Sequence, residues 1–196
     1  MSTLTATHAL TAEGIREFSI ARGEPTFLTE RRLKALETFH ALPLPGRKDE
    51  LWRRVKLEEA DLDLEAASER AGAASVAIKA NDAAAQAGGF WGPVEDAVKH
   101  SPALLEAKWA TEVYPAGNPG DIINRKGGKF HALNQALFDS GYVLHLPKGT
   151  QVAEPFSADF RTRGGKDGIF PHNLIVLEEG AEAVVLETYN SANGDA

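Results

Sequence analysis

The chain has 196 residues, of which 43% are apolar and 25% are charged, a composition typical of one sizeable globular domain or two small ones. Its 21 basic and 28 acidic residues give a formal net charge of −7. This charge argues against a nucleic-acid surface, because such surfaces need clustered Lys and Arg. The absence of cysteine excludes disulfides, a Cys nucleophile and a thiolate metal site.

Neither a targeting segment nor a membrane span is expected. The N-terminal stretch contains Glu13, Arg16 and Glu17 and lacks an apolar run of signal-peptide length. No window of the sequence is apolar over the length that a membrane-spanning helix needs. We therefore expect a cytoplasmic protein.

An amphipathic helix is expected near the start of the chain. Thr11 is a suitable N-cap, because its hydroxyl can accept a hydrogen bond from the first turn. The helix would end near Ala21, with Leu10, Ile15 and Phe18 as its apolar stripe.

A second helix is expected over residues 26–41. Pro43 and Pro45 end it, since proline lacks an N–H donor and restricts the residue before it. Its buried face is expected to hold Leu33, Leu36 and Phe39, and its water-facing side Arg31, Arg32, Lys34 and Glu37.

Short elements separated by glycine and proline are expected in the middle of the chain. Residues 75–79 are typical of a strand, and the alanine-rich residues 82–87 favour a helix. A short helix over 94–99 precedes another that starts at Ser101-Pro102, where Ser caps the helix and Pro takes its first position. Residues 115–129 are rich in Gly, Pro and Asn, which predicts a loop.

The hydrophobic period changes from helical to strand-like within residues 130–156. Phe130, Leu133 and Leu137 lie one turn apart and share a helix face. Gly141 is expected to stop that helix, because glycine adopts the left-handed cap conformation without steric cost.

A strand is expected directly after this glycine. One face should carry Tyr142, Leu144 and Leu146, and the opposite face Val143 and His145. Pro147-Lys148-Gly149 should end the strand.

From that point onward only strands and turns are expected. The apolar run at 173–177 is typical of a strand buried on both faces. The last strand has no following partner, and an unpaired apolar edge invites self-association. The remaining strands are expected over 151–160 and 183–189, with turns at 161–168 and 179–180.

Two segments resemble the SufB/SufD family, whose members build iron–sulfur clusters. The first is PGRKDELWR at residues 45–53, followed by Leu57, and it is similar to the signature after the N-terminal helices of SufD proteins. Residues 54–56 depart from that pattern, which often has an aromatic and a hydroxyl residue there. The second segment is 130–156, which matches the family pattern at Phe130, Leu133, Asn134, Gly141, Pro147, Gly149 and Pro155.

The resemblance implies an α+β fold in which a helical region, 1–140, leads into the first strands of a right-handed parallel β-helix, 141–196. It implies a SufD-like scaffold subunit of a SufBCD-type complex, which is not catalytic by itself. The implied partners are a SufB-like scaffold subunit and a SufC-like ATPase, and the complex rather than this chain assembles the cluster. The family's reactive groups lie in later parts of the β-helix, so none of the histidines here inherits their role.

No catalytic, cofactor-binding or metal-binding residue is predicted. The histidines lack metal-ligand spacing such as HxH or HExxH. His145 is expected to be a solvent-facing or hydrogen-bonded strand residue. The six histidines are His8, His40, His100, His131, His145 and His172.

Two Gly-Lys pairs superficially suggest a phosphate-binding loop. Gly128-Lys129 and Gly165-Lys166 both lack the earlier glycine of that motif, since Ile123 and Phe160 occupy its position. Neither lysine is followed by Ser or Thr, so no Mg²⁺-binding hydroxyl is present. Both pairs are expected to be turns.

Two other function classes remain open. A small cupin-like metal-dependent enzyme would suit a turn between apolar strands, although its histidine cluster is missing; metal analysis of the purified chain would test it. A nonenzymatic interaction module would use the helical region or the last strand to bind a partner.

Trp52, Trp91 and Trp109 are expected to pack in cores, because no basic residues interleave with them as in a base-stacking surface. Trp52 is the best candidate for an anchor that ties the proline-rich connector to its domain. A Trp52→Ala substitution should therefore lower the free energy of unfolding by about 3 kcal/mol or more, measured by denaturant titration. An unchanged unfolding midpoint would contradict the anchor role.

Overall fold

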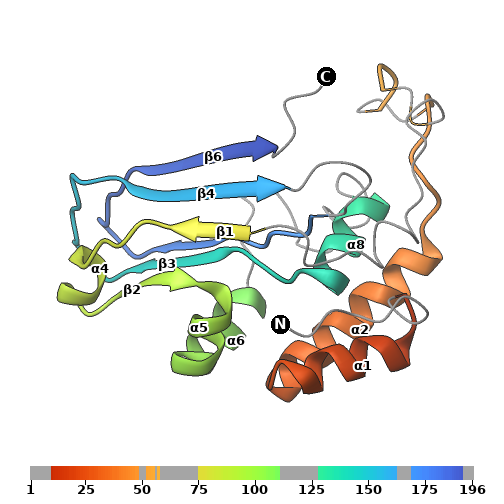
Figure 1. Cartoon of the computed structure of the whole chain (residues 1–196), viewed down its shortest axis with the longest axis horizontal. Coiled ribbons are helices and arrows are strands. Elements are labelled where there is room, and N and C mark those ends of the chain that lie inside the picture. Colours follow the sequence, from red (N-terminus) through yellow and green to blue (C-terminus); the bar gives the residue numbers. More distant parts are fainter. Residues whose placement is uncertain are drawn as a thin grey trace. The chain divides into compact units, whose positions relative to one another are not determined.

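Figure 1 shows a computed structural model of the chain, which describes residues 10–48, 52–55, 57, 75–110, 128–162 and 169–191. The chain divides into two compact units, one formed by Met1–Arg70 with Trp109–Leu137 and the other by Ala71–Lys108 with Phe138–Ala196. The described part of the first unit is helical, and the second contains two three-stranded sheets with short helices. The expected α+β class is confirmed. The domain division at residue 140 stays a prediction, and the compact units group differently because strands before residue 140 pair with strands after it.

The first unit contains α1 (Ala12–Ala21), α2 (Thr26–Ala41) and α8 (Gly128–Leu137). The Thr11 side chain accepts a hydrogen bond from the Gly14 N–H at 3.1 Å, which confirms the predicted N-cap. The predicted ends of the first two helices are also confirmed. The three helices share a core of buried side chains: Ile15, Phe18, Leu28, Leu36, Phe39, Leu133 and Leu137.

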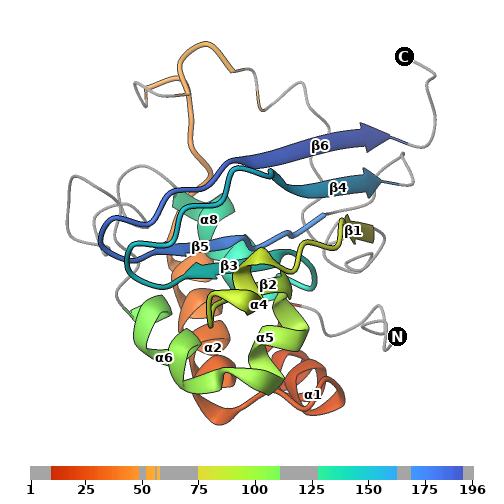
Figure 2. The ribbon, with the colours of Figure 1, turned by 90° about the vertical axis from the view of Figure 1, so that its left-hand side faces the viewer.

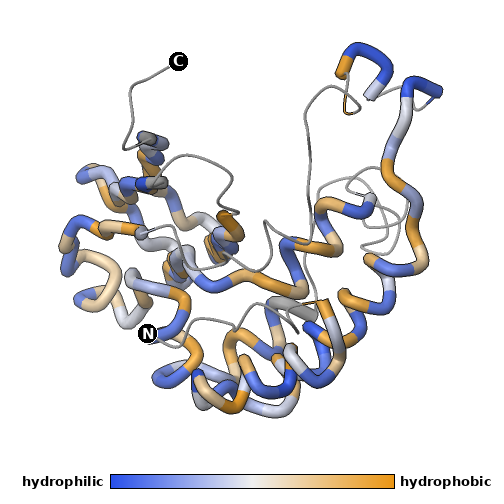
Figure 3. The backbone as a smooth tube through the Cα atoms, turned by 45° about the vertical axis from the view of Figure 1, so that its right-hand side comes forward, coloured by the Kyte–Doolittle hydropathy of each residue, from blue (hydrophilic) through white to orange (hydrophobic). Residues whose placement is uncertain are grey.

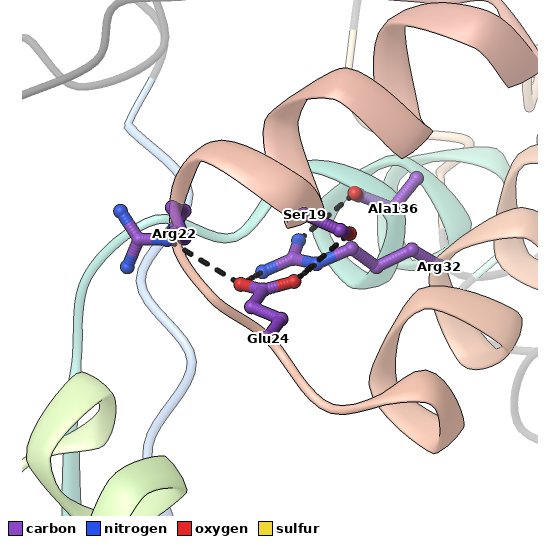
Figure 4. Close-up of polar contacts among 5 residues, drawn as sticks. All are labelled: Ser19, Arg22, Glu24, Arg32 and Ala136. Carbon is purple, nitrogen blue, oxygen red and sulfur yellow. Dashed lines mark hydrogen bonds and ion pairs between the residues drawn. The ribbon is translucent and has the colours of Figure 1, made fainter.

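Arg32 lies in this core with none of its side chain exposed, so the prediction that it faces water is wrong. Its Nε and Nη2 each donate to a carboxylate oxygen of Glu24 at 2.8 Å, and its Nη1 donates to the Ala136 carbonyl at 3.0 Å (Figure 4). The same carboxylate accepts from Ser19 Oγ at 3.0 Å and pairs with Arg22 at 3.3 Å. These charge-assisted bonds offset the cost of removing the guanidinium from water.

Lys129 lies in the first turn of α8, so the predictions of a loop and of a Gly-Lys turn are wrong at this position. Its Nζ donates to the carbonyls of Phe39 and Leu42, at 2.8 and 2.9 Å, and lies 4.2 Å from the centroid of the Phe39 ring. An ammonium group suits the C-terminal end of a helix, where carbonyls lack partners within the helix. Lys129 thus caps α2, and residues 111–127 of the expected loop lie outside the described residues.

Trp52 contacts the start of α8, as expected of an anchor. Its ring centroid lies 5.3 Å from that of Phe130, and the side chain is half-buried. The contact joins residues 52–55 of the connector to the helical unit. Residues 49–51 of the connector lie outside the described part of the chain.

The second unit contains two sheets, in the orders β1-β4-β6 and β2-β3-β5. The first strand of each sheet is antiparallel to its neighbour, whereas the later pairs are parallel. The short helices α4 and α5 pack against β2 and β3, away from β6 (Figure 2). The bounds of these strands and helices are β1 Ser75–Ile78, α4 Ala83–Gln86, β2 Phe90–Pro93, α5 Val94–His100, α6 Pro102–Ala110, β3 Tyr142–Leu146, β4 Phe156–Thr162, β5 Leu174–Leu177 and β6 Val185–Ser191.

The parallel strand pairs give the second unit a structural repeat, although the sequence has no repeat of fixed period. Val143 pairs with Leu174, and Phe156 pairs with Val185. An isolated parallel bridge joins Gln151 to Glu182 between these strands. From Tyr142 onward the chain therefore runs through both sheets twice, first in β3 and β4 and then in β5 and β6, and the second passage lies beside the first in parallel register.

The core of the second unit lies between the two sheets. Tyr142, Leu144 and Leu146 share the buried face of β3, as predicted, and pack with Phe156 and Phe160 of β4. The ring of Trp91 contacts both Tyr142 and Phe156, with centroids 5.0 and 5.1 Å apart, and its Nε1 donates to the Lys79 carbonyl at 2.9 Å. This supports core packing for Trp91, while the Trp109 side chain lies outside the described atoms. Aromatic pairs at these separations stabilise a core beyond their area burial.

Gly141 does not cap α8, because that helix already ends at Leu137. Its φ of 124° and the close approach of the His172 backbone explain the need for glycine. A Cβ at this position would lie 2.1 Å from the His172 carbonyl oxygen. Gly141 therefore lets the second passage of the chain approach the first at the start of β3.

Two strand predictions need correction. The strand predicted to begin at residue 151 begins at Phe156, since Pro155 has no N–H for the ladder. β5 is not buried on both faces, because it is an edge strand of its sheet. The side chains of Ile175 and Leu177 are 46% and 42% exposed.

Along the helices, hydrophilic and hydrophobic residues alternate, as the colours of Figure 3 show. None of the helices in the described ranges combines the length and the apolar character required to cross a membrane. The apolar residues of α1 and α2 instead form stripes that face the helical core.

The Arg32–Glu24 pair predicts a large asymmetry between single and double substitutions. Arg32→Met alone leaves a nearly buried carboxylate without its main partner and should cost about 3–5 kcal/mol. Arg32→Met combined with Glu24→Gln should cost less than Arg32→Met alone, because no unpaired charge remains. Denaturant unfolding of both variants measures the difference.

The exposed Arg16 on α1 offers the matched control, and Arg16→Met should change the free energy of unfolding by less than about 0.5 kcal/mol. Equal stabilities of the Arg16 and Arg32 variants would show that the buried pair contributes nothing to the fold.

Candidate functional site: the open end of the two sheets

β5 and β6 are the edge strands at one end of the two sheets. β5 pairs with β3, and β6 pairs with β4; among the described strands neither has a second neighbour (Figures 1 and 2). At the other end of the sheets, β1 and β2 form the edges, and α4 and α5 pack on β2. We call the surface formed by β5 and β6 the open end.

Core-facing side chains are exposed at the open end. Ile175 and Leu177 pair with Leu144 and Leu146, so they lie on the face that β3 buries. Tyr189 pairs with the buried Phe160 yet is 55% exposed. These residues continue the inter-sheet core, but no described strand covers them.

Glu187 occupies a core-facing position within this apolar surface, because it pairs with the buried Ala158. Its Oε1 accepts from Tyr142 Oη at 2.5 Å and from Asn173 Nδ2 at 2.9 Å. Its Oε2 accepts from Tyr189 Oη at 2.9 Å. Three neutral donors from three parts of the unit thus hold one carboxylate in place.

Burial, together with the Glu187 carboxylate, raises the pKa of both tyrosines. Burial raises the pKa of Tyr142 well above its usual range, and the hydrogen bond to Glu187 raises it further. Burial also raises the pKa of Tyr189 to about 12, with a further contribution from Glu187. Both phenols therefore remain hydrogen-bond donors at neutral pH. Their hydrogen bonds to Glu187 contribute fully to the free energy of unfolding below about pH 10, and this contribution is lost as the pH rises through the pKa values of the folded state.

Polar pairs flank the open end. Asp159 accepts from Arg161 Nε and from Asn190 Nδ2, both at 2.8 Å, and these bonds lower the pKa of its carboxyl. In the other sheet, His145 Nε2 lies 3.0 Å from Glu178 Oε1. This hydrogen bond, followed by one from the Lys148 backbone N–H, lowers the pKa of Glu178.

Three of the described histidines make contacts in separate parts of the chain. His145 contacts Glu178 from its strand, as expected of a hydrogen-bonded strand residue. His40 and His100 contact the backbone carbonyls of Leu10 and Asp96. Within the described ranges, no group of three or more His, Cys, Asp or Glu side chains could hold a metal ion. His8 and the Gly165-Lys166 pair lie outside the described residues.

The sequence predicts only part of the open end. The unpaired last strand was predicted, and the structure places β6 at an edge. The Glu187 cluster was missed, since its donors come from β3, from the residue before β5 and from β6. The available signal was a glutamate two residues before a tyrosine, at the core-facing positions of an apolar strand.

Comparison with known proteins links the chain to iron–sulfur cluster assembly proteins. The assembly protein SufB of Bacillus subtilis is 25% identical over 221 aligned positions, which cover 95% of this chain and 45% of that protein. An iron–sulfur cluster assembly SufBD family protein of Trieres chinensis is 26% identical, over 85% of this chain and 40% of that protein. Another SufBD family protein, from Synechocystis, is 37% identical over 68 residues, which are 35% of this chain and 14% of that protein.

Membership of the SufBD family is supported by relatives that align with 85–95% of this chain at about 25% identity. No family model matches the chain. The chain spans less than half the length of the first two relatives. The resemblance seen in the sequence is therefore confirmed at the level of the family.

The Glu187 cluster predicts a shift in tyrosine titration. Glu187→Gln should lower the pKa of Tyr189 toward the ordinary value of about 10, because the negative charge that stabilises the protonated phenol is gone. Burial remains, so the pKa should not fall below that value. The ultraviolet absorbance of tyrosinate against pH measures the shift, and a Tyr189→Phe variant identifies its component.

Glu182→Gln is the matched control, because Glu182 is exposed on the same segment and its side chain does not contact either tyrosine. Identical titration curves for both glutamine variants would contradict the cluster.

Proposed function

We propose that the chain is a SufD-like scaffold subunit in iron–sulfur cluster assembly and has no catalytic activity by itself. The observation that carries the proposal is the similarity to SufBD family proteins over 95% of this chain. The parallel strand pairs after residue 140 support it, because they make the second unit a platform that further strands or partners can extend.

The finer fold proposal is the start of a right-handed parallel β-helix. In such a fold each turn of the chain stacks on the previous turn and buries its face. The pairs Val143–Leu174 and Phe156–Val185, with the bridge from Gln151 to Glu182 between them, are compatible with two stacked turns. The antiparallel strands β1 and β2 would then cover the first turn.

The SufD assignment within the family rests on the sequence. Residues 45–53 resemble the SufD signature, and the chain has no cysteine with which to bind a cluster directly. One relative is named SufB, and we propose the assignment to SufD on residues 45–53. A subunit without thiolates would have a structural role, in which it positions partner subunits.

The proposed partners are a SufB-like scaffold subunit and a SufC-like ATPase, in the cytoplasm. The buried ion pair of the helical unit and the two sheets provide rigid elements on which a partner can assemble. We assign no ATPase activity to the chain, because its lysines at the two Gly-Lys pairs lack the phosphate-loop pattern and Lys129 caps a helix.

Co-expression of the chain with the SufB-like and SufC-like proteins of its host, followed by pull-down through a tag on the chain, tests the proposal. We expect a stoichiometric complex that survives gel filtration. A co-expressed unrelated scaffold protein is the control for nonspecific capture. Recovery of the chain alone would contradict the subunit role, and ATP hydrolysis by the pure chain would contradict its noncatalytic nature.

A further inference from the structure

We propose that Tyr142 is a proton-coupled oxidation site, at which the phenol gives an electron to an oxidised Trp91 and its proton to Glu187. The proposal concerns an activity of the second unit and does not depend on the role in cluster assembly. It follows from the contact between the two rings, from the short hydrogen bond to the carboxylate and from the lack of easily oxidised sulfur in the chain.

The composition directs oxidation to aromatic side chains. Cys and Met are the residues that oxidants attack most readily, yet the chain has no cysteine and its one methionine is Met1. The chain has three tryptophans and three tyrosines, whose rings are the next easiest to oxidise by one electron. A one-electron oxidant that reaches the chain, such as a radical formed from peroxide, therefore takes its electron from one of these rings.

Trp91 is the ring that first gives up an electron in the second unit. It is only partly buried, and its ring centroid lies 5.0 Å from that of Tyr142. Its Nε1 donates to the Lys79 carbonyl at 2.9 Å. A backbone carbonyl is too weak a base to remove the indole proton, so the oxidised Trp91 remains a radical cation, which oxidises a neighbour more strongly than the neutral radical does. Contact between the rings lets Tyr142 return an electron to it.

Glu187 supplies the base that oxidation of Tyr142 requires. A phenol that loses an electron becomes strongly acidic and has to release its proton. Tyr142 is fully buried, so water does not take that proton directly. Its Oη donates to Glu187 Oε1 at 2.5 Å, which places a carboxylate at the position where a general base must lie. The carboxylate thus makes a buried phenol oxidisable.

The step balances in electrons and protons. The external oxidant takes one electron from Trp91 and is reduced. Tyr142 then passes one electron to the Trp91 radical cation, which restores the neutral indole, and the phenolic proton moves to Glu187 Oε1. The products are a neutral tyrosyl radical and a protonated carboxyl group. The oxidising equivalent has then moved from the partly buried indole into the core of the second unit.

The other donors hold Glu187 in the orientation that accepts the proton. Asn173 Nδ2 donates to the same oxygen and Tyr189 Oη to the second oxygen, both at 2.9 Å. Two of the three tyrosines in the chain therefore share one carboxylate. Packing alone does not require this arrangement, since phenylalanine fills the same space without a hydroxyl. The ring contact with Trp91 selects Tyr142 as the electron donor.

Flash oxidation of the full chain tests the proposal. A photoexcited ruthenium polypyridyl complex with persulfate serves as the one-electron oxidant, and transient absorption follows the tryptophan and tyrosyl radicals. We expect a fast phase in which the tryptophan signal decays while the tyrosyl signal rises. Tyr142→Phe and Trp91→Phe should each remove this phase, whereas Tyr189→Phe should leave it. A fast phase that survives either of the first two substitutions would overturn the proposal.

A second substitution tests the proton acceptor. Glu187→Gln should slow the fast phase at least about tenfold, because an amide is not a base for the phenolic proton. Glu182→Gln, at an exposed position of the same segment, is the matched control and should leave the rate unchanged. Equal rates in these two variants would contradict the role of Glu187.

Two further measurements separate these effects from a loss of structure. Circular dichroism and thermal unfolding verify that each variant is folded. The chain without substitutions provides the comparison where a variant is not folded, because its fast phase should slow in deuterated water if a proton moves together with the electron. A fast phase with the same rate in both solvents would show that no proton transfer accompanies the oxidation of Tyr142, contrary to the proposal.

Discussion

The parallel pairing of each strand with the strand one passage later is the constraint on which the second unit depends. A shift of one residue would move the core-facing side chains of a strand to the other face, because side chains alternate along the strand. The register is held at several points. Gly141 allows the His172 backbone to come close at the start of β3, and Gly149 N–H donates to the Glu179 carbonyl at 2.9 Å in the turn after it. Backbone contacts in the turns and along the strands therefore fix the register of β5 and β6 against β3 and β4.

The helical unit is held together differently. Its central contact is a buried ion pair between Arg32 and Glu24 rather than a repeated backbone register. A bidentate ion pair is directional, so it orients α2 relative to the segment that follows α1, and the bond to the Ala136 carbonyl includes α8. Apolar packing around Leu28 and Leu36 would tolerate small sliding of the helices, whereas the ion pair would not.

Local periodicity predicted the helices and most strands, because these depend on residues close in sequence. The bounds of α1 and α2 and the alternation of β3 follow from such patterns. Arg32 was predicted to face water because a charge counts as exposed unless its distant partner is known. β5 was predicted to be buried because its apolar run says nothing about where the sheet ends. The Glu187 cluster was equally hidden, since its donors lie up to 45 residues away along the chain.

The two ends of the sheets differ in what covers their edge strands, and this difference distinguishes the candidate site. At one end β1 and β2 are the edge strands, and the helices α4 and α5 pack on β2. At the other end Tyr189 stacks on Phe160, with ring centroids 4.7 Å apart, but its outer face remains exposed. Leaving such a surface uncovered costs apolar burial, and the three donors to the carboxylate reduce, without removing, the cost of covering it. The polar group of this surface is hydrogen-bonded, while its apolar side chains face water. A strand laid over the surface would bury those side chains and would form backbone hydrogen bonds with the edge of the sheet.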